Sequence, residues 1–364
     1  MDQQPKVMGS RGLQSMATGE HLPRHGKYGP SWPLVLVVMS TFSAAMYLVL
    51  CGEHSLESPT FAEISMPARG TVPASALFAL RLVSFLLIFI SLTASLTDST
   101  PHSFKSQVWK QSKLTQTTIL VKGLQRLTTF TVQCWTLQLV YFTLTTGISV
   151  WHFAGLPSEG MAAHAVGWLA HAAYAVSLPC AFLTTVVVTF VLLPSRLKAG
   201  DYESITRMLT LRPQLMHNAN LLLMVNELLL CSLPLEVSHF SLCVIFGLLY
   251  VIGSWVWLRK SGVVYYPFLD PTLPSFMAIS LHLLLLITLA VFALFANLVA
   301  RTTADLPLTV RVSLLYALAF SLMHTHHIRG VPPAMKAALA AEAGSMDSGG
   351  QVDCQAGSNL VKWL

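Results

Sequence analysis

Long apolar blocks with almost no charged side chains dominate this sequence of 364 residues. Hydrophobic residues make up 54% of the chain and charged residues only 10%, less than half the charged share of a soluble domain. Most blocks reach the roughly 20 residues that a helix needs to cross about 30 Å of hydrocarbon. Because backbone groups in lipid must be hydrogen-bonded within the protein, such blocks predict helices. The sequence therefore predicts an all-α, polytopic membrane helix bundle and excludes a water-soluble globular fold.

Eight segments are expected to cross the membrane, at residues 33–51, 74–96, 128–151, 163–193, 216–233, 238–258, 275–300 and 307–323. The fourth is overlong and contains Pro179, which predicts a kink or a strong tilt. The fifth is short and lies between Pro213 and Pro234. Three regions follow: a disordered tail at residues 1–30, a helical bundle at 31–325, and a second tail at 326–364.

The positions of the basic residues predict the orientation of these spans. Loops that would lie on one side of the membrane hold 18 Lys and Arg residues, and loops on the other side hold 2. The positive-inside rule then places both termini in the cytoplasm. The net charge of +6 is explained by loops that face anionic membrane lipids, so no nucleic-acid partner is expected. Nothing in the sequence distinguishes the endoplasmic reticulum from the plasma membrane or identifies a protein partner.

Ionisable groups inside the spans are the first places to look for function, because they are costly in lipid. Arg81 and Arg311 lie near span ends, and we expect them to reach the interface by snorkelling. We expect His164, His171 and His282 to be hydrogen-bonded packing residues. These residues alone therefore indicate no site.

No metal or cofactor is expected from the cysteine and histidine spacing. The chain has six cysteines, most of them inside spans, and no pair has the spacing of a metal or redox motif. His324, His326 and His327 follow the last span, but they lack a carboxylate or a cysteine at ligand spacing. We interpret them as interfacial residues.

Two spans carry stripes of polar residues. His217, Asn220 and Glu227 fall within an arc of about 80° on the fifth span, at 100° per residue. The third span has a similar stripe, formed by Thr131, Cys134, Gln138, Tyr141 and Thr145. Polar stripes in lipid should face each other or a wet cavity. We therefore expect these two spans to meet along their stripes.

The openings of these two spans suggest a nucleophile and a base. Thr131 and His217 both lie in the first turns of spans that start on the cytoplasmic side, so their depths should match. A histidine can remove the proton that makes a threonine hydroxyl too weak a nucleophile. The amides of Asn218 and Asn220 could stabilise an oxyanion. Glu227 lies about 15 Å along the helix from His217 and cannot orient its ring directly, so we expect a structural or substrate-facing role.

Three segments together resemble the androgen-induced family of multi-pass membrane proteins, whose members hydrolyse fatty acid esters of hydroxy fatty acids. The first segment has Trp255 and Trp257 at a helix end, followed by residues 261–269, Ser-Gly-Val-Val-Tyr-Tyr-Pro-Phe-Leu. The other two are Thr131 with Gln138 seven residues later, and His217 with Glu227 ten residues later. Pro179 also falls where the family has a proline. The resemblance covers about residues 125–300.

The resemblance implies that Thr131 is the acyl-accepting nucleophile and that His217 is its general base. The chain departs from the family pattern around His217, where Gln214, Leu215, Met216 and Asn218 replace the usual residues, and this leaves the substrate open. The family commonly has about six spans, so the spans at 33–51 and 307–323 look like additions. Tyr266 lies on the same side as the pair and is expected either to cap the site or to anchor a helix end.

We therefore predict a membrane-embedded hydrolase of lipid esters, with Gln138, Glu227 and Tyr266 as further substrate-facing candidates. Its expected partners are the lipid ester substrate and the surrounding membrane lipids. One alternative is a transporter or receptor whose polar stripes line a path or a pocket. The sequence shows no inverted repeat of the kind that marks many carriers. A second alternative is a catalytically inactive member of the same fold.

Overall fold

The computed structural model describes residues 29–51, 58–68, 71–105, 108–115, 118–198 and 202–323. Eight long helical stretches lie where the apolar segments predict them. They are α2 (Trp32–Cys51), α4 (Ala74–Thr97), α5 (Phe130–Phe153), α6 (Met161–Val187), α10 (Asn220–Leu230), α11 (Phe240–Ser261), α12 (Ser275–Ala304) and α13 (Leu308–Leu322). The expected tails and the histidine cluster at 324–327 lie outside the described residues.

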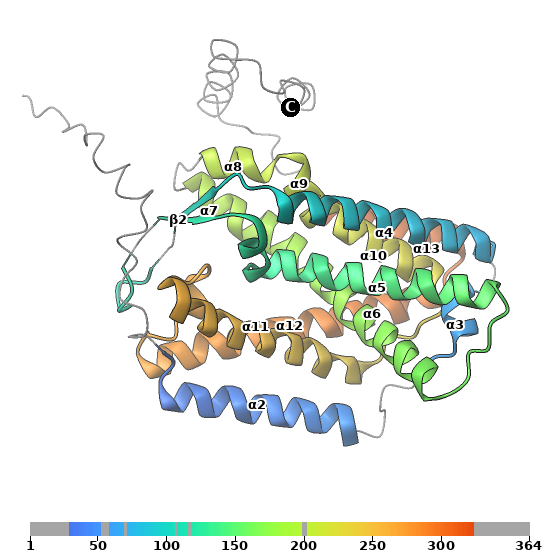
Figure 1. Cartoon of the computed structure of the whole chain (residues 1–364), viewed down its shortest axis with the longest axis horizontal. Helices are drawn as coiled ribbons and strands as arrows, with labels where there is room; N and C mark the ends of the chain where they lie inside the picture. The colour runs from blue at the N-terminus through green and yellow to red at the C-terminus, as the bar shows by residue number, and fades with distance from the viewer. Residues whose placement is uncertain are drawn as a thin grey trace, which may run out of the picture.

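The long helices run side by side along the long axis of the molecule (Figure 1). Helix α6 is central: it packs against α5, α10, α11 and α12, and almost every residue from Ala170 to Thr185 is buried. Helix α2 lies at one edge, against α11 and α12, and α13 covers α10 (Figure 1). Close approach is possible where side chains are small, as at Gly247 of α11, where an added Cβ would lie 2.3 Å from Leu289 Cδ1.

Within the described residues, five helices are long and apolar enough to cross a membrane: Trp32–Cys51, Ala74–Thr97, Met161–Lys198, Val237–Ser261 and Ser275–Ala304. The protein is thus a helical bundle of membrane-embedded character. Helix α5 is 24 residues long, but its polar stripe lowers its hydropathy. Helix α10 has 11 residues and α13 has 15, so neither reaches this length on its own.

The fourth and fifth spans each contain a π-helical turn that the sequence did not predict. Helix α6 continues through the π turn η2 (Val188–Leu192) into α7 (Leu193–Lys198), so that Pro179 lies inside an unbroken helix. The fifth span begins earlier than expected, with α9 (Leu211–Gln214) and the π turn η3 (Leu215–Ala219) before α10. A single π turn inside a helix is frequently found at a functional site.

Short elements connect the long helices at both ends of the bundle. Helix α3 (Phe61–Ser65) lies at one end, and α8 (Tyr202–Met208) lies at the other (Figure 1). Strands β1 (His102–Lys105) and β2 (Thr118–Val121) form an antiparallel pair, which the all-α prediction missed. Three 3-10 turns complete the described elements: η1 (Gly123–Thr128), η4 (Val237–His239) and η5 (Pro267–Leu269).

A buried ion pair joins α4 to α10 in the centre of the bundle. Arg81 and Glu227 are both fully buried, and Arg81 Nε donates to Glu227 Oε1 at 2.7 Å. Arg81 Nη2 donates to Glu227 Oε2 at 3.1 Å, and the Tyr141 hydroxyl of α5 donates to the same oxygen at 2.7 Å. The carboxylate therefore accepts three hydrogen bonds from two other helices, which offsets much of the cost of removing it from water.

The expectation that Arg81 snorkels to the interface is wrong, and for Arg311 it stays a prediction. Arg81 pairs with Glu227 because an arginine in the bundle interior needs a counter-charge. Arg311 is half-buried, and its Nη2 donates to the Leu228 carbonyl at 2.5 Å, near the carboxyl end of α10. A cation in that position also complements the helix dipole.

Removing one partner of the ion pair should destabilise the protein strongly. Arg81→Met or Glu227→Gln would each leave a buried polar group without its partner, at a cost of about 3–5 kcal/mol. The double substitution Arg81→Met with Glu227→Leu should recover most of this loss, because it removes both charges. Thermal unfolding of the purified protein in detergent, followed by tryptophan fluorescence, measures these effects.

The control for this experiment is Val83→Ala, since Val83 is 62% exposed on the same helix. That change should leave the unfolding temperature nearly unchanged. Single variants as stable as the wild type would contradict the role given to the ion pair.

Candidate functional site

The polar stripe of α5 faces the protein interior, as its spacing predicts. Cys134, Gln138, Tyr141 and Thr145 are all buried, and Thr131 at the start of the helix is half-buried. The stripes of the third and fifth spans meet where Tyr141 donates to Glu227. The prediction that these two spans face each other is therefore confirmed at this point.

The hydroxyl of Thr131 differs from those of most other threonines on α5. The hydroxyls of Thr136, Thr143 and Thr145 each donate to the carbonyl four residues earlier, at 2.7–3.0 Å. Thr131 makes no such bond among the described residues: it lies in the first turn of α5, and Leu127, four residues earlier, precedes the helix and accepts from Gln133 Nε2 at 3.0 Å. The Thr131 hydroxyl is in hydrogen-bonding contact with the phenol of Tyr266. This hydroxyl is therefore available for chemistry.

The segment around Tyr265 and Tyr266 covers the beginning of α5. The Thr128 hydroxyl donates to the Tyr265 oxygen at 2.8 Å, and the Tyr250 hydroxyl donates to the Thr128 carbonyl at 3.3 Å. Trp257 stacks on Tyr265, with ring centroids 5.8 Å apart. Burial raises the pKa of Tyr266 to about 12, although its contact with Thr131 acts in the opposite direction. Tyr266 therefore remains a neutral hydrogen-bond donor at pH 7.

His217 lies at the middle of the π turn η3, on the other helix of the predicted pair. Its side chain is half-buried, and its carbonyl accepts a hydrogen bond of 2.5 Å from the Thr185 hydroxyl of α6. A π turn leaves some carbonyls without their usual partner four residues later, and a neighbouring side chain can satisfy them. Thr185 thus fixes the backbone that carries His217.

Thr131 and His217 lie at the same level in the bundle. Helices α5 and α10 start from the same end of the molecule (Figure 1), and α5 packs against η3. Tyr141 follows Thr131 by ten residues and Glu227 follows His217 by ten, and these two later residues are in contact. About 15 Å of α-helical rise leads back from this contact to Thr131, whereas the way back to His217 ends in the π turn η3, so the two residues are expected at similar depths.

No hydrogen bond joins Thr131 to His217 among the described residues. The structure places the two residues at one depth on packed elements, and the pair itself stays a prediction. The two asparagines predicted as oxyanion donors also make no hydrogen bond to Thr131 within the described parts of the chain. Asn220 Nδ2 donates to the Thr184 hydroxyl of α6 at 2.9 Å, and Asn218 Nδ2 donates to Gln214 Oε1 at 2.7 Å.

Gln138 is fully buried, and neither its amide nitrogen nor its amide oxygen has a hydrogen-bond partner among the described residues. The hydroxyl of Ser177 on α6 is in the same condition. The two residues lie at one level, because Cys134 meets Cys180 on one side of them and Tyr141 meets Tyr174 on the other. Buried polar groups are normally satisfied, so this pair is suited to a bound polar group or an ordered water.

An ionic cluster anchors the helix that carries His217 to the start of α5. Arg212 Nη1 donates to Asp98 Oδ2 at 2.5 Å, and Arg126 contacts the same oxygen at 3.5 Å. Arg126 Nη1 also donates to the Ser95 carbonyl at 2.7 Å. The bond from Arg212 is the main cause that holds the pKa of Asp98 well below its usual range. The carboxylate is thus ionised at neutral pH and connects α4, η1 and α9.

The remaining histidines are placed as packing residues where the structure describes them. His171 Nε2 lies 2.8 Å from the Pro234 carbonyl, and His282 Nδ1 lies 2.8 Å from the Ala278 carbonyl, so both expectations are confirmed. The His164 side chain is exposed, so the expectation that it is a packing residue is wrong. No group of three or more metal-ligating side chains that could hold an ion occurs in the described ranges.

The sequence analysis missed two parts of this arrangement. Arg81 could have been found as the counter-charge of Glu227, since each is a charged residue inside an apolar span. Ser177 gives no signal of its own, because a serine in an apolar helix usually bonds to its own backbone. Its position opposite Gln138 depends on the pairing of α5 with α6.

No protein-family model, curated protein or solved structure matches the chain. The fold and site define a class: a helical, membrane-embedded protein with a buried polar centre and a threonine beneath a tyrosine at one end. The resemblance to the androgen-induced family therefore remains a prediction from short motifs.

Cross-linking can test whether the two site residues face each other. In a chain whose own six cysteines are replaced, Thr131→Cys and His217→Cys should be joined by a short bismaleimide. A protease cleavage site inserted between α7 and α8 separates the two residues into different fragments. After cleavage, only cross-linked protein should keep the two fragments together on a denaturing gel. The matched control is Val140→Cys with His217→Cys, because Val140 is on the exposed side of α5. Equal cross-linking of both pairs, or of neither, would argue against a shared site.

Proposed function

We propose that this protein is a membrane-embedded hydrolase of lipid esters, with Thr131 as nucleophile and His217 as general base. One observation carries the proposal: the Thr131 hydroxyl is not bonded to its own helix, and it lies level with His217 on packed elements. The other α5 threonines that bond to their own helix lack such an available hydroxyl. The resemblance at Thr131–Gln138 and at His217–Glu227 supports the same assignment.

The reaction would proceed in two halves through an acylated threonine. His217 takes the proton of the Thr131 hydroxyl as its oxygen attacks the ester carbonyl carbon, and a tetrahedral oxyanion forms. When the intermediate collapses, the imidazolium returns the proton to the departing alcohol oxygen. His217 then takes a proton from water, which attacks the acyl carbonyl carbon. The second tetrahedral intermediate collapses with cleavage of the bond between Thr131 Oγ and the acyl carbon, the imidazolium returns its proton to Oγ, and the carboxylic acid leaves.

Tyr266 is the group best placed to stabilise the oxyanion. Its phenol contacts the Thr131 side chain, and the raised pKa keeps it protonated. Asn218 and Asn220 donate elsewhere, so we assign them to the support of the π turn and the contact with α6. Gln138 lies about 10 Å further along α5 than Thr131, too far to touch the same oxyanion. We assign it to positioning or to a distant part of the substrate.

The proposed arrangement in the membrane has eight spans with both termini in the cytoplasm. Two features support it: the eight helical stretches and the distribution of 18 basic residues against 2. Thr131 and His217 would then lie beneath the cytoplasmic headgroups. A lipid ester already resides at that depth, so substrate and nucleophile meet without leaving the bilayer. Fatty acid esters of hydroxy fatty acids are the substrate class that the resemblance favours.

Substitution of the pair tests the proposed chemistry. Thr131→Ala and His217→Ala should each reduce hydrolysis by about 1,000-fold or more, because the nucleophile or its base is lost. Membranes carrying each variant would be assayed on a panel of lipid esters, together with labelling by a fluorophosphonate that reacts with activated hydroxyls. The matched control, Thr136→Ala, removes a hydroxyl that is bonded to its own helix and should retain activity. Turnover that survives both site substitutions would exclude this mechanism, and an unlabelled wild type would favour a carrier or an inactive fold.

The topology makes a separate prediction. Epitope tags at either terminus should be accessible to antibody after the plasma membrane alone is permeabilised, as should a tag at residues 199–201. A tag in the connection between α5 and α6 should be protected until every membrane is opened, provided the protein resides in an internal membrane. At the cell surface this last tag should instead be accessible on intact cells. Termini on opposite sides would rule out an even number of spans.

A further inference from the structure

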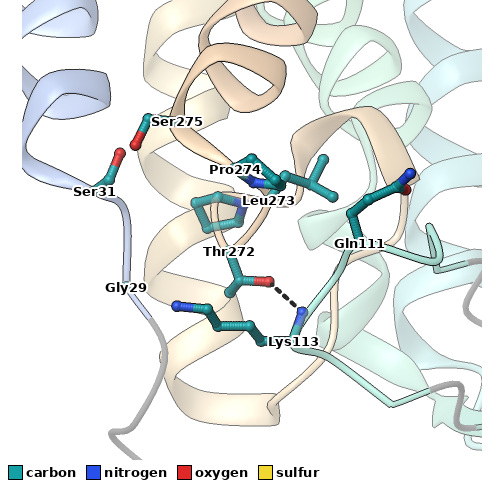
Figure 2. Close-up of a pocket in the computed structure, with 9 residues that line it drawn as sticks. Gly29, Ser31, Gln111, Lys113, Thr272, Leu273, Pro274 and Ser275 are labelled. Atoms are coloured by element: carbon teal, nitrogen blue, oxygen red, sulfur yellow. Dashed lines mark hydrogen bonds between the residues drawn. The ribbon is translucent and has the colours of Figure 1, made fainter.

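A polar pocket lies at the end of the bundle where α2 and α12 begin (Figure 2). Its volume is about 320 Å³. Ser31 and Gly29 form one wall, the turn before α12 forms another, and Gln111 and Lys113 come from the segment at 108–115. The proposed catalytic residues are not part of its lining, so this is a separate site.

Two cations flank the pocket without a counter-charge among the described residues. Lys113 lines it, and its extended side chain is directed toward Gly29 (Figure 2). The Arg259 guanidinium does not line the pocket but lies beside its wall at Gly29, with Nη2 3.4 Å from the position that a Cβ would take. No described carboxylate forms an ion pair with either residue. One cation thus lines the pocket and a second lies beside it.

The lining of the pocket includes several possible hydrogen-bond donors, among them Ser31, Lys113 and Ser275. The hydroxyl of Ser31 is buried and has no partner in the described parts of the chain. Ser31 directly precedes α2 and Ser275 is the first residue of α12, so the starts of two helices border the pocket. Asp270 is nearby but does not line the pocket. Its carboxylate accepts hydrogen bonds from Thr272 N at 2.9 Å and from the Thr272 hydroxyl at 2.7 Å. It also accepts a hydrogen bond from the Ser112 hydroxyl. These bonds hold the two walls together.

We propose that this pocket binds a phosphate-bearing anion, namely the headgroup of an anionic membrane phospholipid. Two cations, free hydroxyls and helix starts together favour a group with several acceptor oxygens. Trp32 directly follows Ser31 and is 71% exposed, and exposed tryptophans at span ends mark the headgroup level. Only 17% of the most apolar stretch of α2 is buried within the protein, so the pocket adjoins a lipid-facing helix. Basic pockets between helices on the cytoplasmic side are suited to such headgroups.

Binding can be measured on the full-length protein in detergent. Thermal unfolding would be followed with increasing dioctanoyl phosphatidic acid, with dioctanoyl phosphatidylcholine and with inorganic phosphate. We expect phosphatidic acid to raise the unfolding temperature in a saturable way, because it binds only the folded state. Phosphatidylcholine should have little effect. An equal shift from inorganic phosphate would retain the site but assign it to a soluble anion.

Matched variants connect the effect to this pocket. Lys113→Ala with Arg259→Ala should weaken binding about tenfold or more, because charge-assisted contacts are lost. Lys110→Ala with Lys260→Ala removes the same charge outside the pocket and should bind normally. Ser275→Glu should abolish binding while Ser275→Gln retains it, and a Glu at a helix start does not threaten the fold. If no anion shifts the unfolding temperature, or if both double variants bind alike, the proposal is overturned. Ester hydrolysis is not part of this readout, so the test is independent of the proposed function.

Discussion

The buried contact of Arg81 and Tyr141 with Glu227 sets the register of three helices. In lipid the apolar surfaces of helices gain little by leaving hydrocarbon, so the alignment of α4, α5 and α10 depends on directional bonds. The carboxylate accepts from both partner helices. A shift of one turn along α4 or α10 would separate buried charges, and a shift along α5 would remove the Tyr141 hydrogen bond from the carboxylate.

This register is what places Thr131 level with His217. The two residues are ten positions from Tyr141 and Glu227, so the ion-pair network determines their depth from a distance of about 15 Å. Near His217, the ion pair of Asp98 with Arg212 attaches the start of the fifth span to the end of α4. The site is therefore held by one buried and one solvent-accessible ionic contact. The buried ion pair makes the alignment of the helices specific, whereas the solvent-accessible ion pair contributes little to the free energy of unfolding.

Helical periodicity was sufficient to predict the inward stripe of α5 and the contact of the two polar spans. Hydropathy alone was sufficient for the approximate limits of the helices. The fate of Arg81 could not be predicted in this way, because snorkelling and pairing differ only in which neighbour the side chain meets. The π turn at His217 was also missed, since its residues give no local signal and Thr185 of α6 stabilises it. Tertiary pairing decides each of these features.

Gln138 is buried by the packing of the helices, although its amide needs hydrogen-bond partners. Its amide lies between the ion-pair network and the opening of α5, fully buried and without a partner among the described residues. A leucine would fit this environment at lower cost, because an unsatisfied buried amide costs about 1–3 kcal/mol. A polar residue at such a place is therefore understandable only if some state of the protein satisfies it. Ser177, at the same level on α6, provides a second unpartnered donor and acceptor, and a hydroxyl group or a water can both donate and accept at such a place.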